Sequence, residues 1–230
     1  MWPSVLTFDC YGTLVQWPET LRRCFTALLP PGADVAAFQA DFVRHQMAEK
    51  AGKYRPFSVI ISDALARTME DWRLGNVMQA QDALLVAIRG LEPYPEVVPV
   101  LLSLARRFRL AIISNTEDAL VAGTLARLQA PFELITAQQG GAYKPDPYLF
   151  RFAMRRLGVE PEDVLHIGAG YYTDMWPAFE LGIARIWINR RGESADPLRP
   201  PSAELHDLSG LEATVDRLIA EHAERGMLNG

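Results

Sequence analysis

Residues 5–15, with the sequence VLTFDCYGTLV, constrain the fold of this chain more than any other segment. They open with a short apolar run closed by a turn signal, a pattern typical of a strand buried in a parallel sheet. Asp9 ends the run, and Gly12 and Thr13 then turn the chain. Ligands of open α/β sheets bind outside the carboxyl ends of the strands, so Asp9 would face a crevice. An aspartate in this place also commonly begins a turn, and the rest of the chain has to decide between the two roles.

The segment that follows has a different pattern. Residues 16–90 carry apolar residues at helical spacing and contain no convincing strand. Helices are predicted there from Leu21 to a stop at Pro30, and near 35–50, 57–72 and 79–88. A proline-punctuated linker at 91–95 ends the block. Beyond it, strands are predicted at 110–114, 133–136, 164–167 and 184–188, and helices at 97–107, 118–128, 147–157, 176–181 and 212–225.

Alternating strands and helices argue for a parallel sheet wrapped by helices. The helical block separates the first strand from the others, which indicates an insertion after that strand. We therefore predict an α/β fold, a Rossmann-like doubly wound parallel sheet core with an inserted all-helical cap domain. The core would comprise residues 1–15 and 91–230, and the cap residues 16–90.

Composition excludes several classes of protein. Of the 230 residues, 49% are hydrophobic and 22% are charged, which is ordinary for a globular chain with a sizeable core. The net charge of −5 argues against a nucleic-acid partner. Two cysteines, Cys10 and Cys24, cannot form a disulfide framework and fit a reducing cytoplasm. We see no signal peptide and no apolar run that could span a bilayer, so a cytoplasmic protein without a membrane partner is expected.

Polar residues follow several of the predicted strands, whose ends should converge on one crevice. They supply carboxylates, hydroxyls, an amide and an ammonium group: Asp9, Tyr11, Thr13, Ser114, Asn115, Lys144 and Asp174. Each has a structural alternative. Asp146, for example, stands before Pro147 in the pattern of a helix N-cap, and we assign it that role. The joint occurrence of the others at successive strand ends favours an active site.

Four motifs resemble those of the haloacid dehalogenase superfamily, in the same order. They are FDCYGTL at 8–14, ISN at 113–115, YKPDP at 143–147 and the stretch from HIG at 166–168 to Asp174. The resemblance covers nearly the whole chain and includes the inserted cap. It implies that Asp9 is a nucleophile that forms a covalent ester, a recognised role for carboxylates. It also implies that Lys144 orients Asp9 and that Asp174 keeps Lys144 charged and in place.

Two positions separate the branches of this superfamily. Its phosphatases usually carry an aspartate two residues after the nucleophile and an acid five residues before Asp174, where this chain has Tyr11 and Ala169. Tyrosine is a weak acid with a reference pKa of about 10, and alanine removes a Mg²⁺ ligand. A small anionic 2-haloacid needs neither a metal nor an acid for its leaving group. Tyr11 and the WINR sequence at 187–190 resemble the L-2-haloacid dehalogenase branch, which implies an (S)-2-haloacid dehalogenase without a cofactor.

The resemblance also implies residues that bind the substrate. Ser114 would hold the substrate carboxylate. Asn115 and a cap arginine, for which Arg44 is the best match, would cradle the leaving halide. Arg44 could equally be an ordinary charged residue on an exposed helix face. Tyr11 and Thr13 complete the predicted set, and a homodimer would be usual for this resemblance.

Other positions depart from the pattern. Dehalogenases of this branch have serine and asparagine where this chain has Ala169 and Tyr171, and a tyrosine where it has Phe150. The residue that places the hydrolytic water is therefore open, with Tyr172, Thr173 and His45 as candidates. Two other functions also stay open. One is a Mg²⁺-dependent phosphatase acting on a small phosphorylated metabolite, and the other is a non-catalytic binding protein.

Overall fold

Six strands form one sheet with the order β3-β2-β1-β4-β5-β6 in the computed structural model, which describes residues 2–228. The strands are β1 (Val5–Phe8), β2 (Arg109–Ser114), β3 (Glu133–Thr136), β4 (Val164–Gly168), β5 (Ala184–Ile188) and β6 (Ala203–Leu205). Every neighbouring pair is parallel. Strand order reverses between β1 and β4, and such a switch point opens a crevice at the carboxyl ends of the strands.

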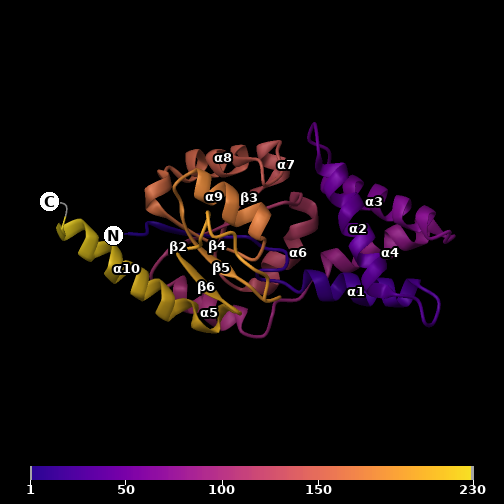
Figure 1. Cartoon of the computed structure of the whole chain (residues 1–230), viewed down its shortest axis with the longest axis horizontal. Coiled ribbons are helices and arrows are strands. Elements are labelled where there is room, and N and C mark those ends of the chain that lie inside the picture. Colours follow the sequence, from indigo (N-terminus) through magenta and orange to yellow (C-terminus); the bar gives the residue numbers. More distant parts are fainter. Residues whose placement is uncertain (1, 229–230) are drawn as a thin grey trace.

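Helices cover both faces of this sheet, which parallel strands require because both of their faces are apolar. The core helices are α5 (Val97–Leu104), α6 (Asp118–Leu128), α7 (Ala137–Gly140), α8 (Pro147–Leu157), α9 (Trp176–Glu180) and α10 (Leu211–Leu228). In Figure 1, α8 and α9 lie on one side of the sheet, and α5 and α10 lie on the other. All residues of β1 and β4 are buried, so these central strands fix the ends from which the site is built.

Four helices lie apart from the sheet at one end of the molecule (Figure 1). They are α1 (Trp17–Leu28), α2 (Val35–Lys50), α3 (Phe57–Asp71) and α4 (Val77–Arg89). Their interior is aromatic: the ring of Phe25 lies 4.9 Å from that of Phe38 and 5.2 Å from that of Phe42. Such ring pairs are favourable beyond the area they bury. The predicted helical cap is therefore confirmed as part of the fold, while its bounds at 16–90 stay a prediction.

Two linkers join the cap helices to the core, and they run side by side. Val15 and Pro93 are partners in an antiparallel bridge. The backbone N–H of Tyr94 donates to the carbonyl of Leu14 at 3.1 Å, and that of Gln16 donates to Glu92 at 3.0 Å. The chain therefore leaves the core and returns to it at one place.

Most predicted elements are confirmed, several with the expected bounds, including α2, α6, α8, β3 and β5. Asp146 caps α8 as predicted, because its side chain accepts a hydrogen bond from the backbone N–H of Tyr148 at 2.8 Å. The short strand β6 and the short helix α7 were not predicted. β6 contains only Ala203, Glu204 and Leu205 at the sheet edge, which is too short for a periodic signal. Within residues 2–228, no helix has both the length and the apolar content to cross a membrane.

Candidate active site

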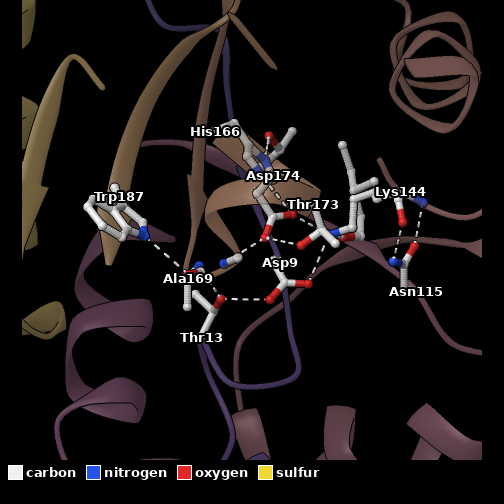
Figure 2. A network of polar contacts seen from close by, with 12 residues as sticks. Asp9, Thr13, Asn115, Lys144, His166, Ala169, Thr173, Asp174 and Trp187 are labelled. Atoms are coloured by element: carbon white, nitrogen blue, oxygen red, sulfur yellow. Dashed lines mark hydrogen bonds and ion pairs between the residues drawn. The ribbon is translucent and has the colours of Figure 1, made fainter. Parts of the chain in front are cut away.

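Asp9 lies directly after β1, at the point where the strand order reverses. The turn that follows requires Gly12, whose φ of 89° lies in the left-handed region that glycine adopts freely. The turn brings the Thr13 hydroxyl back to donate to Asp9 Oδ2 at 2.7 Å, and the same oxygen of Thr13 accepts from the backbone N–H of Ala169 at 2.8 Å (Figure 2). Thr13 therefore holds the Asp9 carboxylate, and the loop after β4 in turn holds Thr13.

Lys144 is the centre of the polar network in Figure 2, and it is 1% exposed. Its ammonium donates to Asp9 Oδ1 at 2.9 Å, to Asp174 Oδ1 at 2.5 Å and to the carbonyl of Ile113 at 2.8 Å. These three acceptors use all three N–H donors of a lysine. A reciprocal pair fixes its backbone: the Lys144 N–H donates to Asn115 Oδ1 at 2.7 Å, and Asn115 Nδ2 donates to the Lys144 carbonyl at 2.9 Å.

Asp174 is fully buried behind Asp9 and is placed by the π-helical turn η2 (Tyr171–Met175). Its Oδ2 accepts from the backbone N–H of Gly170 at 3.0 Å, and His166 Nε2 lies 3.4 Å from its Oδ1. The other ring nitrogen of His166 is paired with the Thr7 hydroxyl at 2.9 Å. His166 is thus a buried histidine with partners on both sides, and it supports Asp174.

Burial and charge act in opposite directions on these groups. Burial acts to raise the pKa of Asp174, but the charge of Lys144 and the hydrogen bond from His166 outweigh it and lower the pKa to about 2. Burial raises the pKa of Asp9 above its usual value, and Lys144 opposes that shift. Burial acts to lower the pKa of Lys144, but the charges of Asp174 and Asp9 raise it. Lys144 is therefore the cation that two buried carboxylates share.

A cavity of about 110 Å³ lies in front of Asp9, between the core and the cap helices. It is lined by Asp9, Tyr11, Trp17, Gln46, Lys50, Phe57, Ser114, Asn115, Gly170 and Thr173. Since one water molecule occupies about 30 Å³ in the liquid, this space suits a ligand of only a few heavy atoms. We call it the inner cavity.

The inner cavity has an aromatic side and a polar side. The rings of Tyr11 and Trp17 stack at 5.3 Å, and Phe57 lies 6.0 Å from Trp17. Burial raises the pKa of Tyr11 far above its usual value, so its phenol is a poor proton donor. On the polar side, the buried Ser114 hydroxyl has no hydrogen-bond partner among the described residues. It is a free donor that faces the ligand space.

A larger cavity of about 540 Å³ shares Lys50 with the inner one, and we call it the outer cavity. Its other walls come from the segment after α2, from the loop around Pro145 and from Tyr172. Tyr172 is 48% exposed there, so this cavity connects the inner site with solvent.

The structure brings most of the predicted site residues together. Asp9, Tyr11, Ser114 and Asn115 line the inner cavity. Thr13 and Lys144 bond directly to Asp9, and Asp174 bonds to Lys144. Of the three candidates for placing water, only Thr173 lines the inner cavity, and its hydroxyl lies 3.4 Å from Asp174 Oδ2. His45 instead pairs with Asp71 at 2.8 Å.

Arg44 is not brought to this site. Its side chain is 60% exposed and pairs with Asp41 at 3.0 Å and Asp71 at 3.7 Å. The reason is helical phase: α2 turns its Phe38, Phe42 and Gln46 inward, and Arg44 lies two residues from Gln46. Two residues rotate a side chain by about 200°, to the opposite face of the helix.

Lys50 is the functional candidate that sequence reasoning missed. It is four residues after Gln46, on the inward face of α2, and it lines both cavities. The spacing 38, 42, 46 and 50 is a regular i, i+4 series, and that signal could have found it in the sequence.

The donor set does not fit a Mg²⁺ ion. Asp9 and Asp174 both direct an oxygen at the Lys144 ammonium, and position 169, where an acid is usual in phosphatases, is alanine. Across residues 2–228 there is no cluster of three or more His, Cys, Asp or Glu side chains that could hold a metal. Mg²⁺ requires several oxygen ligands in near-octahedral geometry, and alanine at position 169 leaves this set one ligand short.

Comparison with known proteins gives a consistent result. A family model described as haloacid dehalogenase-like hydrolase matches residues 3–182. An (S)-2-haloacid dehalogenase of Pseudomonas sp. (strain YL) is 28% identical over 96% of this chain and 97% of its own. The (S)-2-haloacid dehalogenase 4A of Burkholderia cepacia is 26% identical over 89% of this chain and 91% of its own. The solved structure of an L-2-haloacid dehalogenase from Xanthobacter autotrophicus has the same fold, with a TM-score of 0.80 at 20% identity, covering 94% of this chain and 99% of that one. The chain, matched by the family model over far more than half of its length, belongs to the haloacid dehalogenase-like hydrolases.

Proposed function

We propose that this hydrolase is a 2-haloacid dehalogenase that releases halide from a small (S)-2-haloacid through an ester on Asp9. The observation that carries the proposal is the inner cavity. Asp9 is its one lining carboxylate, Lys144 and Thr13 fix that carboxylate, and the position of the phosphatases' acid is Tyr11, whose raised pKa makes it a poor proton donor. The two relatives named above, each similar over most of its length, support the same substrate class.

In the first step, an oxygen of the Asp9 carboxylate attacks C2 of the substrate, and the carbon–halogen bond breaks as the halide leaves with its electron pair. The new bond is a C2–O ester. Thr13 and Lys144 hold the carboxylate against rotation, and holding reactants in an attacking geometry lowers the barrier. Halide needs no proton to leave, which fits the high pKa of Tyr11 at the position of the phosphatases' acid.

In the second step, water attacks the Asp9 carbonyl carbon, and the 2-hydroxy acid leaves with the original Asp9 oxygen. One proton is released overall with the halide. The Lys144 ammonium stands beside the oxygen on which negative charge develops, where a fixed cation is most effective. Thr173 is the candidate for holding the water. It lines the inner cavity, and its hydroxyl lies 3.4 Å from Asp174 Oδ2.

The test is halide release from chloroacetate, fluoroacetate and both enantiomers of 2-chloropropionate. We expect release from the (S) enantiomer to exceed that from the (R) enantiomer. The rate should not change when EDTA is added or Mg²⁺ restored, because the donor set does not fit the ion. Absence of halide release, together with Mg²⁺-dependent hydrolysis of phosphate esters, would support the phosphatase instead. Failure of both would leave the binding protein.

Gly168 provides a test of the way Asp174 is placed. A Cβ on Gly168 would lie 2.8 Å from both Cβ and Cγ of Asp174, which forces Asp174 to move from Lys144. We expect Gly168→Ala to lower the free energy of unfolding by about 1–3 kcal/mol, as overpacking does, and to lower kcat at least tenfold. Gly75→Ala is the matched control, since a Cβ there meets nothing within 4 Å. Equal kinetics of both variants would remove Asp174 from the proposed mechanism.

Two further properties belong to the proposal. A cytoplasmic location is supported by the two cysteines, which are both free thiols. A homodimer is the assembly that the resemblance implies. Fractionation of cells and sedimentation of the purified protein would test these properties.

A further inference from the structure

Lys50 is a charged group in the inner cavity for which the proposed steps have no use. It is the last residue of α2 and is half-buried, with its Nζ 5.2 Å from the centre of the Phe57 ring and 5.8 Å from that of Tyr143. Within the described part of the chain, its ammonium has no hydrogen bond and no carboxylate within ion-pair distance. Its ammonium contacts the faces of these two rings and no acid that the structure describes, and a cation that lines a ligand cavity without an acidic partner points to a negatively charged ligand.

The charges around the inner cavity support this. Asp9 and Asp174 carry two negative charges, and Lys144 neutralises only one of them. His166 adds no charge at neutral pH, because burial lowers its pKa. Without Lys50, the site would carry one net negative charge and would repel a carboxylate monoanion. With Lys50, the site is neutral before the ligand binds.

We propose that Lys50, together with the Ser114 hydroxyl, binds the carboxylate of the substrate. The cap cation expected from the sequence was instead Arg44, at the leaving halide. Both groups line the inner cavity, the Ser114 hydroxyl has no hydrogen-bond partner, and Lys50 has no ion pair among residues 2–228. An ammonium and a hydroxyl that both donate to one carboxylate give short, charge-assisted hydrogen bonds. The inference rests on the proposed function in one respect: that function identifies the ligand as a small 2-substituted carboxylate.

The pKa of Lys50 gives this binding a pH dependence. Burial and the charge of Lys144 lower it to about 8, and Asp9 acts in the opposite direction. The titratable groups that share the two cavities with Lys50 are Asp9, Tyr11, Lys53, Tyr54, Tyr143, Lys144, Asp146 and Tyr172. The ammonium form binds the carboxylate, so binding holds below about pH 8 and weakens above it. A bound carboxylate favours the ammonium and should raise the pKa of Lys50.

Steady-state kinetics on (S)-2-chloropropionate provide the first test. Lys50→Met removes a charge-assisted hydrogen bond, which should raise KM on the order of 10–100-fold with a smaller change in kcat. Lys50→Arg should restore most of the affinity. Lys53→Met removes the same charge from an exposed residue that lines only the outer cavity, and it should change KM less than about twofold. A large rise in KM for Arg44→Ala with none for Lys50→Met would overturn the inference.

The second test does not need turnover. The chain has three lysines, Lys50, Lys53 and Lys144, so lysine labelled with ¹³C at Cε gives three signals that the Met variants assign. We expect the Lys50 signal to titrate near pH 8, and to titrate at higher pH when propionate is added but not when propionamide is added. A titration that propionate leaves unchanged would reject the inference. If wild-type protein releases no halide while propionate still shifts Lys50, the proposed function fails and this binding site stands.

Discussion

Asp9→Asn should abolish halide release, reducing it by at least about 10⁴-fold, because an amide cannot attack carbon as a carboxylate does. The fold should survive, since the amide has the shape of the carboxylate and keeps an acceptor for Thr13 or Lys144. Halide release measures the activity, and circular dichroism measures the fold. Asp82→Asn, an exposed position on α4, is the matched control and should retain wild-type activity.

Isotope labelling shows whether the essential Asp9 forms the ester. One turnover of excess enzyme in ¹⁸O-water should place the label in the peptide that contains Asp9, because water attacks the Asp9 carbonyl carbon. The 2-hydroxy acid should be unlabelled, since its new oxygen comes from Asp9. Label found only in the product would mean that water attacks the substrate directly, and Asp9 would lose its role as nucleophile.

Lys144→Ala should have the second large effect, on both rate and stability. It removes the cation beside the nucleophile and the developing oxyanion, which typically costs on the order of 10²–10³-fold in rate. It also leaves the buried carboxylates of Asp9 and Asp174 without a counter-ion, and such a loss costs about 3–5 kcal/mol of unfolding free energy. Lys53→Ala removes an exposed lysine and should leave both quantities near wild type.

The pH dependence of stability separates this effect from a simple loss of packing. In the wild type, the pKa of Asp174 is lowered to about 2, so its stabilising contribution is complete above its usual pKa of 3.8 and is lost as the pH falls toward 2. In Lys144→Ala, the two carboxylates are easier to protonate, so the destabilisation should be smaller at pH 5 than at pH 8. Urea unfolding at both pH values measures it. An equal loss at both values, with near-normal turnover, would contradict the role given to Lys144.

Much of this site follows from the sequence, because strand ends and turn residues are local signals. The apolar run before Asp9 predicts its place at the end of β1, and the short segment from Tyr143 to Asp146 predicts the loop that carries Lys144. Parallel pairing then brings residues that are more than 100 positions apart to one edge of the sheet. The direction in which the Lys144 side chain points could not be predicted from the sequence, because the buried acceptors Asp9 and Asp174 set it in the folded protein.

The cap was harder to predict at the level of single residues. Its helices follow from periodicity, but a motif match placed Arg44 at the substrate without regard to which face of α2 it occupies. Phe38 and Phe42 define the buried face, and helical phase then excludes Arg44 and selects Lys50. Strand β6 could not be predicted from the sequence for a different reason. It is an edge strand of three residues, and it is a strand only because β5 lies beside it.

The paired linkers at Val15 and Pro93 make the cap an exchangeable module. Because its two ends lie together, a helical insertion of another length, or a tight turn, can join the same two points without disturbing β1. Closing a longer loop between fixed ends adds little entropic cost, so inserted segments can grow or shrink over evolution at this point. The chemistry of Asp9 and Lys144 would be inherited unchanged, while the segment that carries Lys50 could be replaced as a unit. The range of substrates can then change while the catalytic step stays the same.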